Sequence, residues 1–249
     1  MRRFFIPADR VIAERALLKN GEFHHLRHVL RLGPNALIDL YDDRGASYEG
    51  TITSIGPDYA EICIIKTFAP EETRLALTLG QCLLKGSKMD LVVEKATELG
   101  VSTIAPIKSD RAVSVVPTEK QTGRLERWRR ITIAAAKQSG NLPPEIMPLQ
   151  SLREFLNSCP GESEKIVFSE QERETHIAKL ADQKLRVASV HILIGPEGGF
   201  RQSELTEANQ VGFQSVSLGP EVLRAETASI SAVTACRLFW GPMSFPPLR

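Results

Sequence analysis

The chain has 249 residues, of which 42% are hydrophobic and 24% charged, and its formal net charge is +1 at pH 7. This composition is typical of a soluble globular protein with room for one large or two modest domains. The near-neutral charge gives no global argument for nucleic acid as a partner. No apolar run approaches the roughly 18 residues that a membrane span needs, so we expect no membrane partner. The four cysteines are widely spaced without a CxxC pair, which favours free thiols and a cytoplasmic protein.

The first 70 or so residues alternate apolar and polar side chains between turn residues. Short strands at this spacing predict a small antiparallel barrel. Helical spacing over residues 23–32 interrupts the pattern, and a polar hinge at 70–73 marks a domain boundary. The expected domains are therefore residues 1–72 and residues 73–249. The expected strands of the first domain are 36–41, 47–55 and 59–65.

From about residue 74 the sequence alternates between strand and helix patterns. An apolar strand at 75–84 precedes an amphipathic helix, for which Ser87 and Asp90 suggest a weak capping box and Gly100 the end. This alternation predicts a mainly parallel sheet covered on both faces. The further strands expected are 101–107, 165–168, 190–194 and 215–218, and the further helices 127–139 and 225–239.

Two glycine-punctuated segments, residues 194–200 and 218–228, are the most informative feature. Each follows a β-branched run and leads into a helix pattern, so the two can form the walls of a ligand site at the carboxyl ends of neighbouring strands. Glycines there allow close approach of backbone to a ligand, and nearby apolar residues offer a slot suited to an adenine or a sulfonium. Simple tight turns are the alternative interpretation.

Several other chemistries lack support in the sequence. Residues 80–87 look like a phosphate loop, but lysine precedes glycine and the motif lies inside a strand. The first glycine segment lacks the G-x-G-x-x-G spacing of a dinucleotide site. His24 and His28 share a helical face without any HExxH motif or cysteine pair, so we expect no metal. No G-x-S-x-G elbow indicates a serine hydrolase.

Basic residues are clustered despite the small net charge. The clusters are Arg2–Arg3, 24–31, Lys85 with Lys88, and 124–130. A solvated helix face explains any one of them, but four together favour a polyanionic substrate.

At the two glycine segments, and in several other short motifs, the chain resembles the RsmE family of bacterial 16S ribosomal RNA (uracil-N3) methyltransferases, members of the knotted SPOUT superfamily. The resemblance covers nearly the whole length, and the order and spacing of its short motifs make it specific. Besides the two glycine segments, the motifs are Arg3-Phe4-Phe5, 28–32, 85–90, 94–101, Ser109-Asp110-Arg111, Arg127-Trp128 and Gln138-Ser139-Gly140.

The resemblance implies an N-terminal PUA-like β-barrel that binds RNA, followed by a SPOUT α/β domain with a C-terminal trefoil knot. It also implies S-adenosylmethionine as cofactor, 16S rRNA within the 30S particle as substrate, and a homodimer. By position, the residues that line the cofactor pocket would be Leu193, Ile194, Gly195, Pro196, Gly198, Gly199, Leu218, Gly219 and Leu223. The catalytic residues would be Arg224, Glu226 and Thr227. RNA would be held by Arg3, Arg31, Lys85, Lys88 and Arg111.

The chain departs from the family pattern at three positions. Glu221 stands where the family usually has arginine, and Lys137 and Asn141 replace a glutamate and an arginine. A lost arginine at Asn141 would weaken an RNA phosphate contact, and the exchanged charges of Lys137 and Glu221 compensate if the two meet in space. These departures affect substrate contacts more than the cofactor site.

The leading hypothesis is methylation of a uridine N3 in 16S rRNA, with Arg224 stabilising the developing imide anion. One alternative keeps the cofactor but acts on another RNA nucleotide, in tRNA or at a 2′-O position. Another is a non-catalytic ribosome-assembly factor that binds RNA. The helix expected at 225–239 is apolar around most of its circumference, so it needs cover on more than one side. Burial within one subunit and burial in a dimer interface both provide this cover, and the resemblance implies the homodimer interface.

Overall fold

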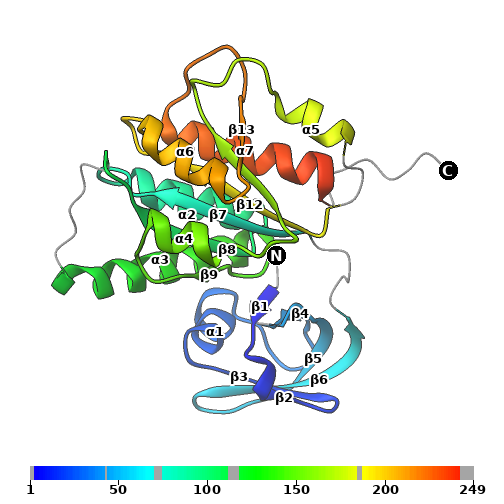
Figure 1. Cartoon of the computed structure of the whole chain (residues 1–249). Helices are drawn as coiled ribbons and strands as arrows, with labels where there is room; N and C mark the ends of the chain where they lie inside the picture. The colour runs from blue at the N-terminus through cyan, green and yellow to red at the C-terminus, as the bar shows by residue number, and fades with distance from the viewer. Residues whose placement is uncertain (1–2, 43, 70–74, 112–117, 184–186, 242–249) are drawn as a thin grey trace. The chain divides into compact units, whose positions relative to one another are not determined.

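The computed structural model describes residues 3–42, 44–69, 75–111, 118–183 and 187–241. The chain divides into two compact units, residues 1–72 and 73–249 (Figure 1). Each unit has its own hydrophobic core.

The first unit contains a six-stranded sheet. Alternate residues of its strands, among them Leu40, Ile52 and Ile62, are buried on one face. The pairings are antiparallel as predicted, except that the first strand runs parallel to its neighbour. A parallel pair needs a long connection, and more than 30 residues separate these two strands. In spatial order the strands are β1 (Arg3–Phe5), β4 (Leu37–Tyr41), β5 (Ser47–Ile55), β6 (Tyr59–Phe68), β3 (Arg15–Lys19) and β2 (Val11–Ile12).

The predicted helical interruption of this unit is confirmed. A short 3-10 helix, η1 (Ala8–Arg10), precedes it, and the interruption consists of α1 (Asn20–His24) continued by a π-helical turn, η2 (His25–Val29). Leu26 anchors the segment in the core, where it is fully buried. The rings of His24 and His28 lie on the outside with centroids 4.7 Å apart, so their shared helical face is also confirmed.

The second unit contains a seven-stranded sheet in which every pairing is parallel. The predicted mainly parallel sheet is therefore confirmed, and its central strands are buried on both faces as such sheets require. In spatial order the strands are β10 (Gln150–Ser151), β8 (Thr103–Lys108), β7 (Ala76–Cys82), β12 (Ser189–Ile194), β11 (Glu164–Phe168) and β13 (Gln214–Val216), and β9 (Glu145–Ile146) also pairs with β8.

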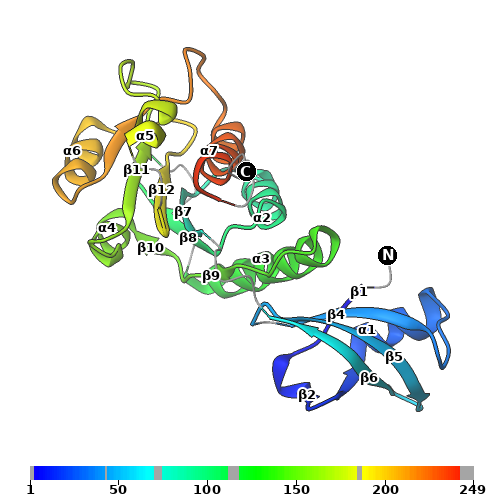
Figure 2. The ribbon, with the colours of Figure 1, turned by 90° about the vertical axis from the view of Figure 1, so that its right-hand side faces the viewer.

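Helices cover both faces of this sheet, as Figure 2 shows. Four helices contribute to the larger core on one face: α2 (Lys88–Glu98), α3 (Thr118–Ser139), α5 (Ile177–Gln183) and α7 (Ala225–Trp240). Two pack on the other face: α4 (Leu152–Ser158) and α6 (Gln202–Gln210). The sheet is thus enclosed, and the strand ends are the places left for a site.

Helix α2 follows its predicted stripe, because Met89, Val92 and Val93 are buried in the core. It ends where Gly100 takes a φ of +75°, a left-handed conformation that favours glycine. The predicted capping box is wrong, since the Ser87 side chain makes no capping hydrogen bond. Asp90 instead faces α3.

The Asp90 carboxylate accepts hydrogen bonds from Arg127 Nε, at 3.0 Å, and from Trp128 Nε1, at 3.1 Å. These bonds join α2 to α3, so the residue that sequence reasoning assigned to a local cap has a tertiary role. Helix α3 also begins at Thr118, earlier than the predicted residue 127.

Helix α7 is buried along one side by the sheet and α2, through residues such as Ala232, Val233 and Cys236. Near its end Leu238 remains 43% exposed and Phe239 36% exposed. Burial within one chain therefore covers only part of its apolar surface.

All four cysteines are free, as predicted: Cys63 is exposed, and Cys82, Cys159 and Cys236 are buried. Burial raises the pKa of the Cys82 and Cys236 thiols to about 12. Among the described residues, no helix is long and apolar enough to cross a membrane.

Candidate functional site

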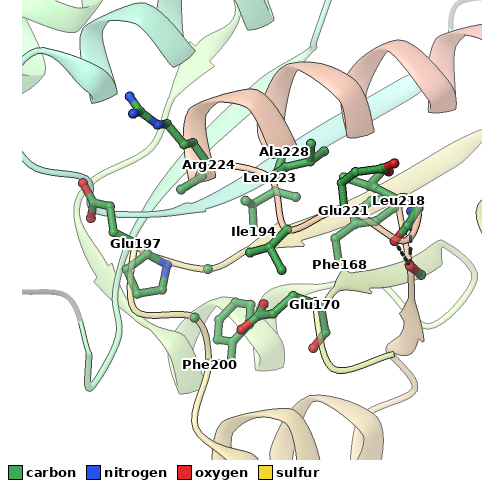
Figure 3. Close-up of a pocket in the computed structure, with 18 of the residues that line it drawn as sticks. Phe168, Glu170, Ile194, Glu197, Phe200, Leu218, Glu221, Leu223, Arg224 and Ala228 are labelled. Atoms are coloured by element: carbon green, nitrogen blue, oxygen red, sulfur yellow. Dashed lines mark hydrogen bonds between the residues drawn. The ribbon is translucent and has the colours of Figure 1, made fainter. Parts of the chain in front are cut away.

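A pocket of about 350 Å³ opens at the carboxyl ends of β11, β12 and β13, beside the start of α7. Both glycine segments contribute to it, as their spacing predicted. Its apolar lining includes Phe168, Ile194, Phe200, Leu218 and Leu223 (Figure 3). A pocket of this size and character suits a small organic ligand with a flat apolar part.

Gly195 and Phe200 define one wall of the pocket. Phe200 is 2% exposed, and a Cβ added to Gly195 would lie only 3.1 Å from its ring. The absence of a side chain at Gly195 therefore lets the loop fold back over Phe200. Gly199, at a φ of +65°, completes the turn.

The opposite wall contains a tight turn between β13 and α7. The buried Ser217 hydroxyl accepts a hydrogen bond from the Gly219 N–H at 3.2 Å and donates one to the Gly219 carbonyl at 2.9 Å. Gly219 has a φ of +143°, which a residue with a side chain rarely adopts. The turn presents Leu218 to the pocket.

Glu197 joins three segments at the pocket rim. Its carboxylate accepts a hydrogen bond from the Lys85 N–H at 3.1 Å and lies 3.3 Å from Lys88 Nζ, which is also 3.4 Å from a Glu226 carboxylate oxygen. Burial raises the pKa of Glu197, but the Lys85 N–H, the Glu197 N–H and the Lys88 ammonium outweigh it and hold the pKa below its ordinary value. Lys88 thus connects the start of α2 with the loop after β12 and with α7.

The loop after β8 is held against the first glycine segment. Arg111 Nη1 donates to the Gly198 carbonyl at 2.9 Å, and Arg201 Nη1 lies 3.0 Å from Asp110 Oδ2. The Asp110 N–H donates to the buried Glu204 carboxylate at 3.0 Å. The Ser-Asp-Arg motif therefore supports the backbone of the loop that carries Pro196 and Gly199.

Arg224 lies at the N-cap of α7 and lines the pocket, and its exposed side chain extends outward at the rim (Figure 3). The sixteen-residue helix adds the partial positive charge of its N-terminus at the same place. This edge of the pocket thus suits a group that develops negative charge.

The structure brings most of the expected site residues together. Pocket-lining positions are occupied by Ile194, Gly195, Pro196, Gly199, Leu218, Gly219, Leu223, Arg224 and Lys88. Leu193 does not line the pocket; it is buried in the core on the opposite face of the sheet. Gly198 does not line the pocket either, since it packs on Arg111. Glu226 pairs with Lys88, and Thr227 is exposed on the first turn of α7.

The expected RNA contacts lie on both units. Lys85 and Arg111 are exposed on loops that contact the first glycine segment. In the first unit, Arg3 stacks over the Tyr41 ring at 4.8 Å, and Arg31 is exposed with a φ of 52°.

Sequence reasoning missed the contribution of β11 to the pocket, which comes through Phe168, Ser169 and Glu170. The sequence did indicate this contribution, because the strand ending at Phe168 was predicted. The carboxyl ends of neighbouring parallel strands lie at the same edge of the sheet, where the glycine segments were expected. Phe200, the last residue of the first glycine segment, lies in the pocket wall as expected for that segment, although it was not among the individually named cofactor residues.

Asn141 and Glu221, two of the departures from the family pattern, have distinct surroundings. Asn141 Nδ2 donates to the Glu98 carbonyl at 2.6 Å and so caps the end of α2. Its side chain is thus committed to the fold rather than to solvent. Glu221 lines the pocket.

The histidines show no metal site: the described residues contain no group of three or more metal-binding side chains. Burial lowers the pKa of His191 in β12, and the nearby Lys165 adds to this effect. His176 bridges to Ser217 through its backbone and supports the turn beside the pocket.

Comparison with known proteins shows which class of protein has this fold and this pocket. A family model described as an RNA methyltransferase domain matches residues 71–237, which include the whole pocket, and one described as an RNA methyltransferase PUA domain matches residues 18–65. The fold and site are therefore those of an RNA methyltransferase preceded by a PUA domain.

Individual relatives show which family of RNA methyltransferases the chain resembles. The chain is 30% identical to the ribosomal RNA small subunit methyltransferase E of Buchnera aphidicola subsp. Schizaphis graminum, over 97% of this chain and 96% of that one. It is 34% identical to the enzyme of the same name from Aquifex aeolicus, over 88% and 92%. A crystal structure of the Neisseria gonorrhoeae enzyme bound to S-adenosyl methionine has a TM-score of 0.84, 33% identity, and coverage of 96% and 98%. The chain belongs to the ribosomal RNA small subunit methyltransferase E family.

Proposed function

We propose that the protein transfers a methyl group from S-adenosylmethionine to N3 of a specific uridine in 16S rRNA. The observation that carries this proposal is the pocket between the two glycine segments, in a chain whose Neisseria relative was crystallised with S-adenosyl methionine. The residues 1–72 would bind RNA and residues 73–249 would carry the methyltransferase site. The trefoil knot stays a prediction.

The pocket fits this cofactor in size and chemistry. Phe168, Ile194 and Leu218 offer an apolar surface for the adenine, and the bare Cα of Gly195 leaves room that a side chain would fill. The ladder between β11 and β12 ends at Phe168 and Ile194, and the residues that follow both strands line the pocket. Carboxylates among the lining residues suit the cationic groups of the ligand.

When bound, S-adenosylmethionine supplies an electrophilic methyl group on its sulfonium. Residues of the chain would orient the uracil and stabilise the anion that forms as N3 loses its proton. Arg224 and the N-terminus of α7 place positive charge at the rim for this purpose. Lys85, Lys88 and Arg111, with Arg3 and Arg31 on the first unit, would hold the RNA backbone.

An Arg224→Ala variant tests this assignment. Loss of a preorganised donor to a developing anion lowers kcat by about 100-fold to 1,000-fold, while Kd for S-adenosylmethionine should change little because the side chain extends out of the pocket. Arg153→Ala is the matched control, since Arg153 is exposed on α4 and pairs with Glu207. Equal loss of activity in both variants would reject the role of Arg224.

Primer extension on 16S rRNA tests the substrate. A strain without the gene should lose the reverse-transcriptase stop caused by an N3-methyluridine, and the wild-type gene should restore it. If the stop persists in the deletion strain, the proposed target is wrong. Mass spectrometry of nucleosides from rRNA and tRNA would then reveal another methylated nucleotide. Absence of S-adenosylmethionine binding in calorimetry would instead favour an assembly factor.

We also propose a homodimer with α7 in its interface. Leu238 and Phe239 are exposed at the end of a helix that begins beside the pocket, and aromatic side chains of this kind are enriched in interface cores. Sedimentation equilibrium should give twice the chain mass of 27.5 kDa. The mass of a single chain at micromolar concentration would contradict the dimer.

A further inference from the structure

Two carboxylates of the pocket lack a partner of opposite charge. Glu170 follows β11 and Glu221 precedes α7, and both line the cavity. Neither forms a hydrogen bond or an ion pair with any of the described residues. By contrast, Glu197 and Glu226 at the rim share the Lys88 ammonium. Glu170 and Glu221 are therefore the lining carboxylates without a cationic partner among the described residues, and the positive charge of Arg224 lies at the rim.

The two carboxylates lie against different walls. Glu170 packs on the bare Cα of Gly199, where an added Cβ would collide with its carboxylate oxygen. Glu221 lies over the turn of Ser217 and Gly219, with Oε2 3.3 Å from the place of a Cβ on Gly219. Figure 3 shows them on opposite sides of Ile194. A ligand between the glycine segments thus has negative charge on two sides.

We propose that Glu170 and Glu221 make the pocket selective for the cationic cofactor over its demethylated product; this inference rests on the proposed function. In the reaction the carbon–sulfur bond of the sulfonium breaks, its electron pair stays on sulfur, and the methyl carbon bonds to N3, whose proton passes to solvent. The sulfonium becomes a neutral thioether, so the product S-adenosylhomocysteine carries one positive charge less. The two carboxylates therefore bind S-adenosylhomocysteine more weakly than S-adenosylmethionine, which speeds the replacement of the product by new cofactor.

The size of the effect follows from Coulomb's law. Two unit charges about 4 Å apart in a water-like environment interact strongly enough to change Kd by about fivefold. Removal of either carboxylate should therefore raise Kd for S-adenosylmethionine by about fivefold. The Kd for S-adenosylhomocysteine should rise less, because only its ammonium group remains to be attracted.

Calorimetry with both ligands on the full-length protein tests the inference. The variants are Glu170→Gln, Glu221→Gln and their combination, which keep side-chain size and remove charge. The matched control is Glu162→Gln, because Glu162 is exposed before β11, outside the pocket, and forms no ion pair with the described residues. The affinity ratio of cofactor to product should fall in the pocket variants and stay unchanged in the control. Added salt should lower the ratio in the wild type more than in the double variant.

The outcomes separate the two proposals. Equal changes of Kd for both ligands, or an unchanged ratio in the double variant, would reject charge selection while leaving the methyltransferase function intact. A wild-type protein that binds neither ligand at millimolar concentration would reject the proposed function itself.

Discussion

Ser229 and Gln81 form a buried hydrogen bond that joins the first turns of α7 to β7. The Ser229 hydroxyl donates to Gln81 Oε1, and both side chains are at most 1% exposed. Gln81 lies beside Ile194 in the sheet, so this bond fixes the start of α7 directly under the pocket. Substitution of Ser229 by alanine leaves the amide oxygen of Gln81 buried without this donor.

A buried acceptor that loses its partner costs about 1–3 kcal/mol, and we expect a value near the middle, about 2 kcal/mol, because alanine fits the helix without strain. With a urea m-value of about 3 kcal/mol per M for a unit of this size, the midpoint should fall by about 0.7 M. Tryptophan fluorescence is the assay, because both tryptophans, Trp128 and Trp240, are buried in the second unit.

Ser231→Ala is the control in the same helix, because Ser231 is half-buried and its side chain makes no hydrogen bond with the described residues. It should change stability by less than about 0.5 kcal/mol. All variants are compared at one protein concentration, since the midpoint of a dimer depends on it. A Ser229→Ala midpoint equal to that of Ser231→Ala would show that the bond between Ser229 and Gln81 does not stabilise the second unit.

Three further predictions concern packing, charge and thiol access. Gly80→Ala should destabilise the second unit by about 1–3 kcal/mol in the same assay, because its Cβ would lie 2.5 Å from the buried Phe155 ring; Phe155→Leu should restore part of the loss, and no rescue would count against the clash. The lowered pKa of Glu197 means that its ionised form stabilises the fold above the ordinary value of 4.5, and this contribution is lost as pH falls through the folded-state pKa. The stability difference between wild type and Glu197→Gln should therefore be largest near neutral pH and shrink below pH 4.5; a constant difference would contradict this. One thiol, that of Cys63, should react rapidly with a thiol reagent in the native protein and four after denaturation; rapid reaction of two or more native thiols would show that the buried sites open.

Local patterns predicted much of the fold. Hydrophobic periodicity predicted β7, α2 and α7, and the glycine at residue 100 ended α2 as expected. The strand before each glycine segment predicted which ends of the sheet form the pocket. These features depend on residues close in sequence, which is why the sequence was sufficient for them.

Contacts between distant segments could not be predicted in this way. Asp90 was assigned to a cap, yet it bonds to Arg127 and Trp128, which are 37 and 38 residues away. Glu170 enters the pocket from a strand whose alignment with β12 only the fold reveals. Leu193 is a different case, because adjacent side chains of a strand face opposite sides of a sheet. This two-residue alternation already implied that Leu193 and Ile194 would not both line the pocket.

The shared ammonium of Lys88 has a consequence for how this sequence can change over evolutionary time. Lys88 is the common partner of Glu197 and Glu226, which lie on two different segments. A neutral replacement of the lysine leaves two neighbouring anions beside a pocket that already contains Glu170 and Glu221. A neutral substitution of Lys88 is thus expected only after Glu197 or Glu226 has changed. Substitutions at these three positions should therefore occur together rather than singly.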